Sequence, residues 1–478
     1  MALRHRVPVK LRLHWKLVAL CVAFLAACWG VFGTGTIRPY VTTGQAASPG
    51  TVVRDIAGTE DLFDPSVSHE VKLTFRDEAY EDMLGEYFKD GEKKYVEADL
   101  TIDGTTIPSV GIRLKGNSTL RGLTWKGQGR TGGGNPPEGA RPPAGVQRPG
   151  GERPAGGQPR GGGFGAALKA EEPENLPWLI SFDEFAEGRR YQGRTQVAVR
   201  PAGVASTAVL NEALGISVVG AAGEPTQRST YGSFTVNGRT SAPRLLVEYL
   251  DEGYAESLGD GVLYKSLATG SFTYKGEDQT EYVEDFKQID KVGGKDLQPV
   301  IDLVRWVNEA SGEEFAAGLA DRLDVESFAR YLALQNLMIN FDDMAGPGRN
   351  YYLWYDLGTE KFRVITWDLN LAFNGDATAG PDDTIGMGGG RGPMRTGHPL
   401  KEKFLADAGF KKLYQEQYRE LYAELLAGGG ATELLDGLVT AYKLNGGADA
   451  AKVDAEATSL RTLLRTRTDS LRSSFSGS

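Results

Sequence analysis

The residues from Asn340 to Asn374 contain the side chains of this sequence that are best suited to chemistry. A predicted helix ends in a loop with Asp342 and Asp343, and Asn350 then precedes a predicted strand. A hairpin follows, and its second strand ends at Asp368. Because a hairpin brings its two open ends together, we expect Asn350 and Asp368 to be neighbours.

These side chains offer hard oxygen ligands of the kind that Mg²⁺ prefers. In proteins Mg²⁺ binds one or two carboxylates and takes its other ligands from water and phosphate groups. The order Asp, a few residues, Asn, hairpin, Asp is also that of a protein-kinase catalytic centre. Spacing alone equally allows a structural role, in which these Asp and Asn residues cap buried turns.

The scarcity of cysteine and histidine excludes several other chemistries. Both cysteines, Cys21 and Cys28, lie near the N-terminus, and two of the four histidines precede them. The rest of the chain has only His69 and His398, which excludes a cysteine nucleophile, a zinc finger and a multi-histidine metal site. We expect His398 to be structural, so the chemistry falls to carboxylates, amides, Lys and Arg.

The length and charge of the chain limit its organisation and partners. A chain of 478 residues suits two or three domains. The net charge is -10, and the first 34 residues contribute +5, so the remainder carries -15. A strongly acidic body argues against a nucleic-acid partner held by a basic surface.

The N-terminus has the pattern of a membrane-targeting segment. Residues 1–16 are basic and residues 17–33 are uncharged, which is close to the shortest length that spans a bilayer. We expect residues 1–34 to be a basic cytoplasmic segment and a single anchor in the cell membrane, with the body outside the cytoplasm. A lipoprotein attached at Cys28 and a cleaved signal are the alternatives. Residues 35–67 are expected to form a stalk.

The hydrophobic pattern of the body predicts an α+β protein with a strand-rich region over residues 68–252. Alternating apolar residues predict strands from His69 and over 95–102, 109–114, 178–182, 196–200, 232–236 and 244–250. Helices are predicted over 80–88 and from Ser206 to Leu214, ending before Gly215.

Within this region, residues 127–163 form a predicted disordered insertion. Of these 37 residues 21 are Gly or Pro, too few apolar groups to offset the entropy of ordering. A tolerated surface insertion and a basic tether to an acidic polymer or partner are both consistent with this composition.

Helical periodicity dominates residues 253–425, and further helices are predicted over 426–478. The predicted helices are 297–309, 313–320, 325–339, 411–426, 431–445 and 454–473, and the hairpin comprises 351–355 and 362–367. A Gly-rich segment, Gly386–Gly392, is either a loop that gates substrate access or a simple flexible loop.

Four blocks of this chain resemble the CotH family of atypical kinases, named after spore coat protein H. The blocks are residues 111–118, 237–249, 263–265 and 340–373. The most specific parts are Lys115–Ser118 and the combination of Asn350–Leu353 with Trp367–Leu369. The resemblance covers about residues 68–425, apart from the Gly/Pro insertion.

The resemblance implies a reduced, bilobal kinase-like fold that binds ATP and Mg²⁺ and phosphorylates Ser or Thr of a protein. By position, Asp342 resembles the catalytic Asp, with Asp343 as the alternative, and Asp368 and Asn350 resemble the metal ligands. The chain departs from the kinase pattern because it lacks the His-Arg-Asp and Asp-Phe-Gly triplets. It also has Asn370 where many relatives have Asp, which puts a second metal carboxylate in doubt.

Several residues are candidates to hold the nucleotide. Lys115, Asn117 and Ser118 follow a strand, where small residues let backbone N–H groups approach a phosphate, although an ordinary turn is the alternative. Arg200 precedes the helix that contains Glu212, and we expect this pair to replace the kinase Lys–Glu ion pair.

Two more residues are candidates from the family resemblance. Glu248 lies where the hinge between the lobes is expected, so that its backbone could contact adenine. Lys265 either belongs to the site or is a surface lysine after a strand.

The leading hypothesis is a kinase that transfers the ATP γ-phosphoryl group to a protein Ser or Thr hydroxyl, with Mg²⁺, at the cell envelope or spore surface. An inactive envelope scaffold or binding protein is the main alternative, because a body outside the membrane meets little ATP. A metal-dependent hydrolase that uses the same carboxylates is a third hypothesis.

Overall fold

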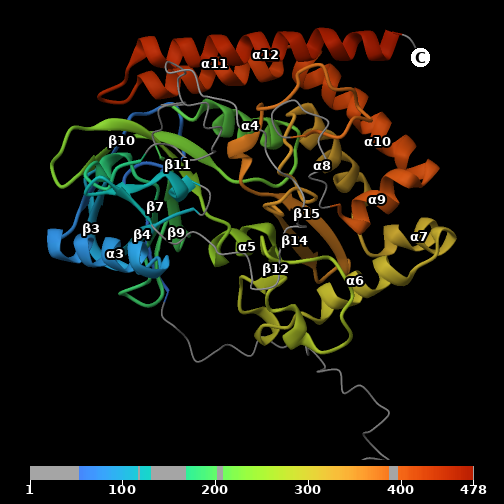
Figure 1. The fold of residues 1–478 in the computed structure, drawn as a ribbon, viewed down its shortest axis with the longest axis horizontal. Coiled ribbons are helices and arrows are strands. Elements are labelled where there is room, and N and C mark those ends of the chain that lie inside the picture. Colours follow the sequence, from blue (N-terminus) through green and yellow to red (C-terminus); the bar gives the residue numbers. More distant parts are fainter. Residues whose placement is uncertain (1–52, 117–118, 131–167, 202–207, 387–396, 477–478) are drawn as a thin grey trace, which may run out of the picture. The chain divides into compact units, whose positions relative to one another are not determined.

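A strand-rich first half and a helix-rich second half make up this α+β protein, as the hydrophobic pattern predicts (Figure 1). The computed structural model describes residues 53–116, 119–130, 168–201, 208–386 and 397–476. Residues 51–478 form one compact unit, so the strand-rich region, the helical region and the C-terminal helices are parts of a single body.

Seven strands among the described residues close into a barrel in the order β10-β11-β9-β7-β4-β3-β2, completed by the parallel pair β10 and β2. Their bounds are β2 His69–Thr74, β3 Val96–Ile102, β4 Thr105–Leu114, β7 Trp178–Ser181, β9 Gln196–Val199, β10 Ser229–Val236 and β11 Ala242–Glu248. In β2 the buried residues His69, Val71 and Leu73 alternate with exposed ones. This period of two is what a sheet that closes around a core requires.

A helix next to the barrel strands, α3 (Asp77–Asp90), adds to the barrel core. It buries Tyr80, Met83, Leu84 and Tyr87. These side chains join one hydrophobic cluster with the inward residues of the barrel strands, including Trp178. Apolar burial of this extent is the main stabilising term for the barrel.

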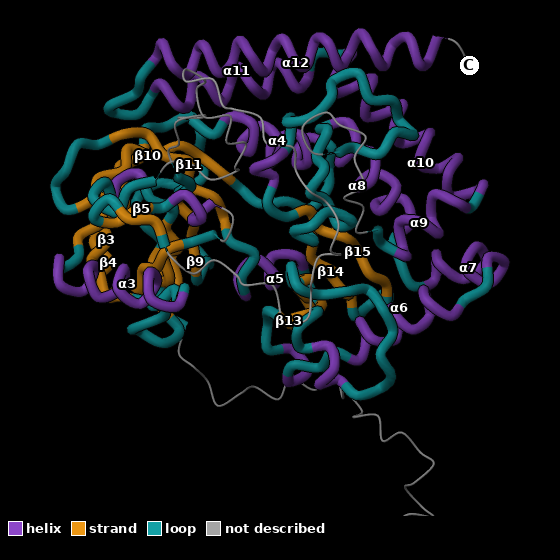
Figure 2. The backbone as a smooth tube through the Cα atoms, in the orientation of Figure 1, coloured by secondary structure: helices purple, strands orange, loops and turns teal. Residues whose placement is uncertain are grey.

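A second sheet is antiparallel and lies among the helices of the second half (Figure 2). Its order is β13-β12-β14-β15, with β12 Gly261–Ser266, β13 Phe286–Gln288, β14 Tyr351–Asp356 and β15 Lys361–Thr366. The predicted hairpin is β14–β15, in which Tyr351 lies opposite Thr366. The residues that precede β14 and follow β15 therefore meet at one end of the sheet.

The helices around this sheet are α5 Glu252–Leu258, α6 Gln298–Glu309, α7 Gly312–Gly318, α8 Val325–Leu337, α9 Pro399–Ala406 and α10 Ala408–Leu421. Four of them, α6, α7, α8 and α10, correspond to predicted helices, whereas α5 and α9 are not predicted from the sequence. The central helix, α8, packs against both α10 and β15. Its N-terminus is capped by Asp324, whose carboxylate accepts a hydrogen bond from the Ser327 N–H.

The C-terminal helices, α11 (Gly430–Lys443) and α12 (Ala450–Ser476), pack against each other and against α4 (Leu210–Ala221). From α12 the fully buried Arg467 reaches the end of α8, where it donates to the Asn336 carbonyl (3.0 Å) and side-chain oxygen (2.7 Å). The same guanidinium contacts the Ala379 carbonyl. The described residues 426–476 are therefore integral to the helical core.

The predicted bounds of the helix near Ser206 are wrong. Residues 202–207 lie outside the described part, and the described helix α4 begins at Leu210 and continues through Gly215 to Ala221. Gly215 lies inside the helix instead of ending it, and its lack of a side chain lets a distant segment pack closely against α4. A Cβ there would lie 3.2 Å from the Leu369 Cβ and 3.3 Å from the Ala372 Cβ.

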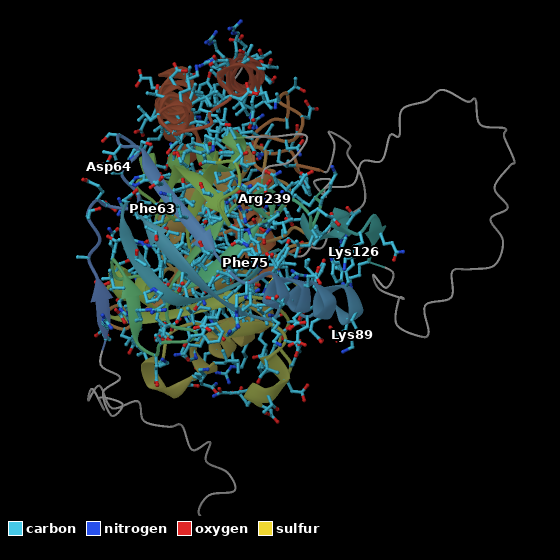
Figure 3. The ribbon with its side chains drawn as sticks, turned by 90° about the vertical axis from the view of Figure 1, so that its left-hand side faces the viewer. Phe63, Asp64, Phe75, Lys89, Lys126 and Arg239 are labelled. Carbon is cyan, nitrogen blue, oxygen red and sulfur yellow. The ribbon has the colours of Figure 1, made fainter. Side chains whose placement is uncertain are left out.

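The stalk prediction for residues 35–67 is wrong for the part that the structure describes. β1 (Arg54–Ile56) pairs in parallel with β8 (Arg189–Tyr191), and Leu62 and Phe63 are buried. Figure 3 labels Phe63 and Asp64 in this segment, beside the barrel strands. Two large apolar side chains within a polar stretch are enough to dock the segment onto the body.

The predicted insertion lies mostly in residues 131–167, outside the described residues. Its first residues are ordered, because β5 (Thr124–Trp125) pairs with β6 (Gln128–Gly129). Among the residues that the structure describes, no helix is both long and apolar enough to cross a bilayer. The predicted anchor, residues 1–34, is outside that part of the chain.

We predict that Gly215→Val lowers the free energy of unfolding by about 1–3 kcal/mol, because the new side chain overpacks the contact with Leu369 and Ala372. The matched control is Gly437→Val in α11, where nothing lies within 4 Å of an added Cβ. That control should change stability by less than about 0.5 kcal/mol. Denaturant unfolding measures both, and equal losses would contradict the packing role of Gly215.

Candidate active site

Asp368 occupies the centre of the candidate site, two residues after the end of β15. Its backbone is left-handed (φ 54°), and its Oδ1 lies 2.7 Å from Arg200 Nη2. Burial raises the pKa of Asp368, but the nearby Arg200 guanidinium and Lys115 ammonium outweigh this and hold the pKa below its usual value. The carboxylate is therefore negatively charged at neutral pH.

Arg200 binds two carboxylates at once. It follows β9, and its Nε and Nη2 lie 2.6 Å and 2.5 Å from the two oxygens of Glu212 in the first turn of α4. The expected Arg200–Glu212 pair is thus formed, and Arg200 also reaches Asp368. The Arg200 carbonyl in turn accepts a hydrogen bond from the buried Arg244 (2.9 Å), which fixes the backbone at this point.

Two lysines meet beside this network in a box of aromatic rings. Lys115, at the end of β4, lies 5.3 Å from the Trp367 ring centre, and Lys265 of β12 lies 5.2 Å from the same ring. Tyr249 lies 6.0 Å and 5.9 Å from the two ammonium groups, and Tyr352 lies 5.6 Å from that of Lys265. Aromatic faces stabilise such cations in the absence of an anion.

Neither ammonium group forms an ion pair with a described carboxylate within 4.0 Å. Burial lowers the pKa of Lys115 to about 7, and repulsion by Arg200 and Lys265 adds to the effect. Nearby Lys93 also has its pKa lowered to about 8, first by burial and then by Arg113 and Lys265. Positive charge is therefore concentrated here in a chain whose net charge is negative.

The loop after α8 holds Asp342 and Asn350 together. Asp342 Oδ1 accepts from the Gly348 N–H (2.6 Å), and Oδ2 accepts from Asn350 Nδ2 (3.0 Å). Gly348 is required here, because an added Cβ would lie 2.7 Å from Asp342 Oδ2 and 2.6 Å from Asn350 Nδ2. Burial raises the pKa of Asp342, and the carboxylates of Asp368 and Asp343 raise it further.

Asp343 faces elsewhere. Its Oδ1 accepts from the Ala345 N–H (2.8 Å), its Oδ2 pairs with Lys401 of α9, and it lines a separate cavity. The two neighbouring aspartates therefore point into different surroundings. Asp342 is the one of the two that contacts Asn350, and the nearby Asp368 carboxylate helps to raise the pKa of Asp342.

Other candidate residues lie apart or outside the described part. Asn117 and Ser118 are among the residues that are not described. The backbone of Glu248 is already paired, because its N–H donates to the Arg228 carbonyl (2.9 Å) and its carbonyl accepts from Gln227 (2.9 Å).

The side chain of Glu248 is also engaged within the protein, because it accepts from Arg194 (2.7 Å). The next residue, Tyr249, is the one that faces the lysines.

His398 is buried between Phe272 and Tyr351, which agrees with its expected structural role. Burial lowers the pKa of His398 to about 3, so the ring is neutral. Lys265 and Tyr352 lie opposite each other because β12 pairs with β14. These two strands are distant in sequence, so strand alternation alone does not show that their side chains meet.

The donor set fits a bound Mg²⁺ ion. Asp368 supplies an ionised carboxylate, and Asn350 uses only its nitrogen in the described contacts, which leaves an amide oxygen. Hard oxygen donors of this kind suit Mg²⁺. Asn370 offers no second carboxylate after Asp368, and its backbone carbonyl accepts from Asn211 of α4 (2.7 Å).

A comparison with known protein families found a match. The family model described as CotH kinase protein matches residues 159–459, which include Arg200, Glu212, Lys265, Asp342 and Asp368. The chain therefore belongs to the CotH kinase family and is a kinase-like protein. No curated protein is similar enough to the chain to count as a match.

We predict that Arg200→Gln lowers the free energy of unfolding by about 3–5 kcal/mol, because it leaves Glu212, which is 2% exposed, as an uncompensated buried charge. The double variant Arg200→Gln/Glu212→Gln should lose less than the sum of the single variants. Chemical denaturation of the four proteins completes the double-mutant cycle.

A matched control for this cycle is Arg190→Gln, which removes another bidentate pair, with the exposed Glu256. It should cost no more than about 1 kcal/mol. Additive effects of the Arg200 and Glu212 substitutions would show that their pair is not coupled.

Proposed function

We propose that this protein is a kinase that transfers the γ-phosphoryl group of ATP to a Ser or Thr hydroxyl of a protein. The observation that carries the proposal is the pair Lys115 and Lys265, two converging ammonium groups with no described carboxylate partner. They lie beside the carboxylate of Asp368. A polyphosphate with a bound cation suits such a site, because its oxygens can pair with the lysines and its cation with the carboxylate.

The lysines and the aromatic box supply binding and charge stabilisation. Lys115 and Lys265 would pair with phosphate oxygens, whose negative charge offsets the burial and the repulsion by Arg200 and Lys265 that lower the pKa of Lys115. Tyr249 and Trp367 offer flat apolar surface next to the lysines, suited to the sugar or base of a nucleotide. Fixed charges aimed at a phosphoryl group stabilise the transition state without reorganisation.

Asp342 is the residue best placed to act on the acceptor. Its raised pKa makes it a better base than an ordinary aspartate, and Asn350 and Gly348 fix its orientation. In the proposed reaction the acceptor oxygen attacks the γ-phosphorus, the bond to the β-phosphate oxygen breaks, and the hydroxyl proton passes to Asp342. ADP and the phosphorylated protein are the products.

Mg²⁺, when bound, would supply neutralisation of the phosphate charge. Asp368 and Asn350 are the residues proposed to hold it, since their oxygens lie at the open end of the hairpin. Arg200 keeps Asp368 ionised and oriented through its bond to Oδ1. Glu212 in turn holds Arg200, the role that a helix glutamate has toward lysine in kinases.

The proposed place of action is the cell envelope or spore surface. The support is the sequence of residues 1–34, where a basic segment precedes an uncharged one, as in an anchor with its body outside the cytoplasm. The proposed acceptor is a protein of that surface. An attached lipid at Cys28 would lead to the same location.

A non-catalytic binding role is the second candidate function. One observation favours it: Arg200 already neutralises Asp368, the main proposed metal ligand. A scaffold of this kind would keep the ion pair for stability and would gain nothing from ATP or Mg²⁺.

We predict that Asp368→Asn lowers phosphoryl transfer by about 100-fold or more, because it removes the ionised oxygen proposed to bind Mg²⁺. Asp342→Asn should also lower it strongly, because it removes the base. Autophosphorylation with labelled ATP measures both, beside Asp302→Asn in α6 as a surface control of equal charge change. Undiminished phosphoryl transfer by Asp368→Asn would contradict the assignment of Asp368 as the Mg²⁺ ligand.

We predict that ATP with Mg²⁺ stabilises the protein by about 2.7 kcal/mol at a concentration about 100 times the Kd. Thermal unfolding with and without ATP, and with EDTA in place of Mg²⁺, measures this. Lys115→Met and Lys265→Met should abolish the gain, because each removes a cation proposed to pair with the phosphate groups. Equal stability of the wild type with and without ATP would favour the scaffold.

A further inference from the structure

A cavity of about 350 Å³ lies beside the loop after α8, and Asp343 of that loop lines it. One wall is the loop itself, from Asn340 to Gly346, and the opposite wall comes from α9 and α10. The cavity is distinct from the lysine box, because Lys115, Lys265 and Trp367 do not line it.

The position of the cavity places it beside the proposed base. Asp342 and Asp343 are consecutive, so their Cα atoms are about 3.8 Å apart. Asp342 faces Asn350, whereas Asp343 lines the cavity. An extended chain advances about 3.3 Å per residue. A peptide whose hydroxyl reaches Asp342 therefore brings a side chain about one to three residues away to the cavity.

The charges at the cavity favour a cation. Asp343 is paired with Lys401, and Asp382 with Lys411 (3.4 Å). Asp383 and Glu402 also line the cavity, and no described cation forms an ion pair with either. The lining residues thus have four carboxylates and two ammonium groups, a net negative charge in front of any ligand.

The interior suits a long side chain with a polar end. Leu332, Phe341 and Leu405 supply apolar walls. His398 also lines the cavity and is 1% exposed, and its Nδ1 has no hydrogen-bond partner among the described residues. Its Nε2 contacts the Tyr351 hydroxyl at 3.2 Å. A ring that donates from Nε2 to that hydroxyl is neutral and adds no positive charge to the cavity lining.

We propose that this cavity binds an Arg or Lys side chain of the acceptor protein, about one to three residues from the Ser or Thr that is phosphorylated. The aliphatic part of that side chain packs on the apolar walls, and its cationic end meets Glu402 and Asp383. The inference rests on the proposed function, because it names the acceptor class of the same reaction.

Two assays on the full-length protein test the proposal. The probes are peptides with one Ser and with Arg, Gln or Glu at each neighbouring position. Phosphate transfer gives KM and kcat, and fluorescence anisotropy of labelled peptides gives Kd without turnover. At one position at least, the Arg peptide should have a KM and Kd about tenfold below those of the Gln peptide. Equal values at every position, or preference for Glu, would overturn the proposal.

Variants assign the preference to the cavity. Glu402→Gln should raise the KM and Kd of the Arg peptide by about fivefold to tenfold and leave the Gln peptide and the KM for ATP unchanged. Glu402→Arg should reverse the preference toward the Glu peptide. Glu416→Gln in α10, an exposed residue that does not line the cavity, is the matched control. An unchanged preference in Glu402→Arg would also overturn the proposal.

The two proposals fail in different ways. If no peptide is phosphorylated and no autophosphorylation occurs, the kinase function fails, while the anisotropy assay still measures whether the cavity selects Arg. If transfer occurs with no charge preference at any position, the kinase function stands and the cavity assignment fails.

Discussion

The bridge that Arg200 forms between Glu212 and Asp368 is the interaction on which the rest of the site depends. It connects the end of a barrel strand, the first turn of α4 and the turn after the β14–β15 hairpin. These three segments belong to different parts of the fold, and further contacts hold them in place. Arg244 donates a hydrogen bond to the Arg200 carbonyl. In α4, Asn211 donates to the Asn370 carbonyl and Gly215 packs closely against Leu369, so α4 is fixed to the turn after Asp368. Buried charges pair only when such support fixes their geometry, because each costs several kcal/mol to desolvate.

Unlike Arg200, the two lysines beside this network have no carboxylate within ion-pair distance among the described residues. Lys115 and Lys265 share aromatic neighbours instead of carboxylates, and their repulsion is a cost in the free protein. Functional sites commonly retain such unfavourable charge where a ligand of opposite sign is to be bound. The acidic character of the chain as a whole strengthens this argument, since the positive charge is local and is not a consequence of composition.

Local patterns predicted much of this fold, and long-range packing decided the rest. The hairpin and the strand-end position of Lys115 follow from strand alternation and turn signals, which depend on neighbouring residues. The Arg200–Glu212 pair is expected from the resemblance to kinases. The continuation of α4 through Gly215 does not, because a glycine ends a helix by local rules and stays inside it only when a distant segment packs against it. The burial of Leu62 and Phe63 and the different surroundings of Asp342 and Asp343 likewise depend on segments distant in sequence.

The buried Arg467 has a consequence for when the site comes into existence. Its guanidinium joins the last helix to the end of α8 and to residue Ala379, so the loop with Asp342 rests on a side chain made near the close of synthesis. Chains grow at about 5–20 residues per second, and the barrel is complete long before α12 emerges. A nascent chain can therefore complete the barrel, with Lys115 at the end of β4, well before α12 can hold the end of α8. The order of synthesis thus delays the final packing of α8 until α12 has been made.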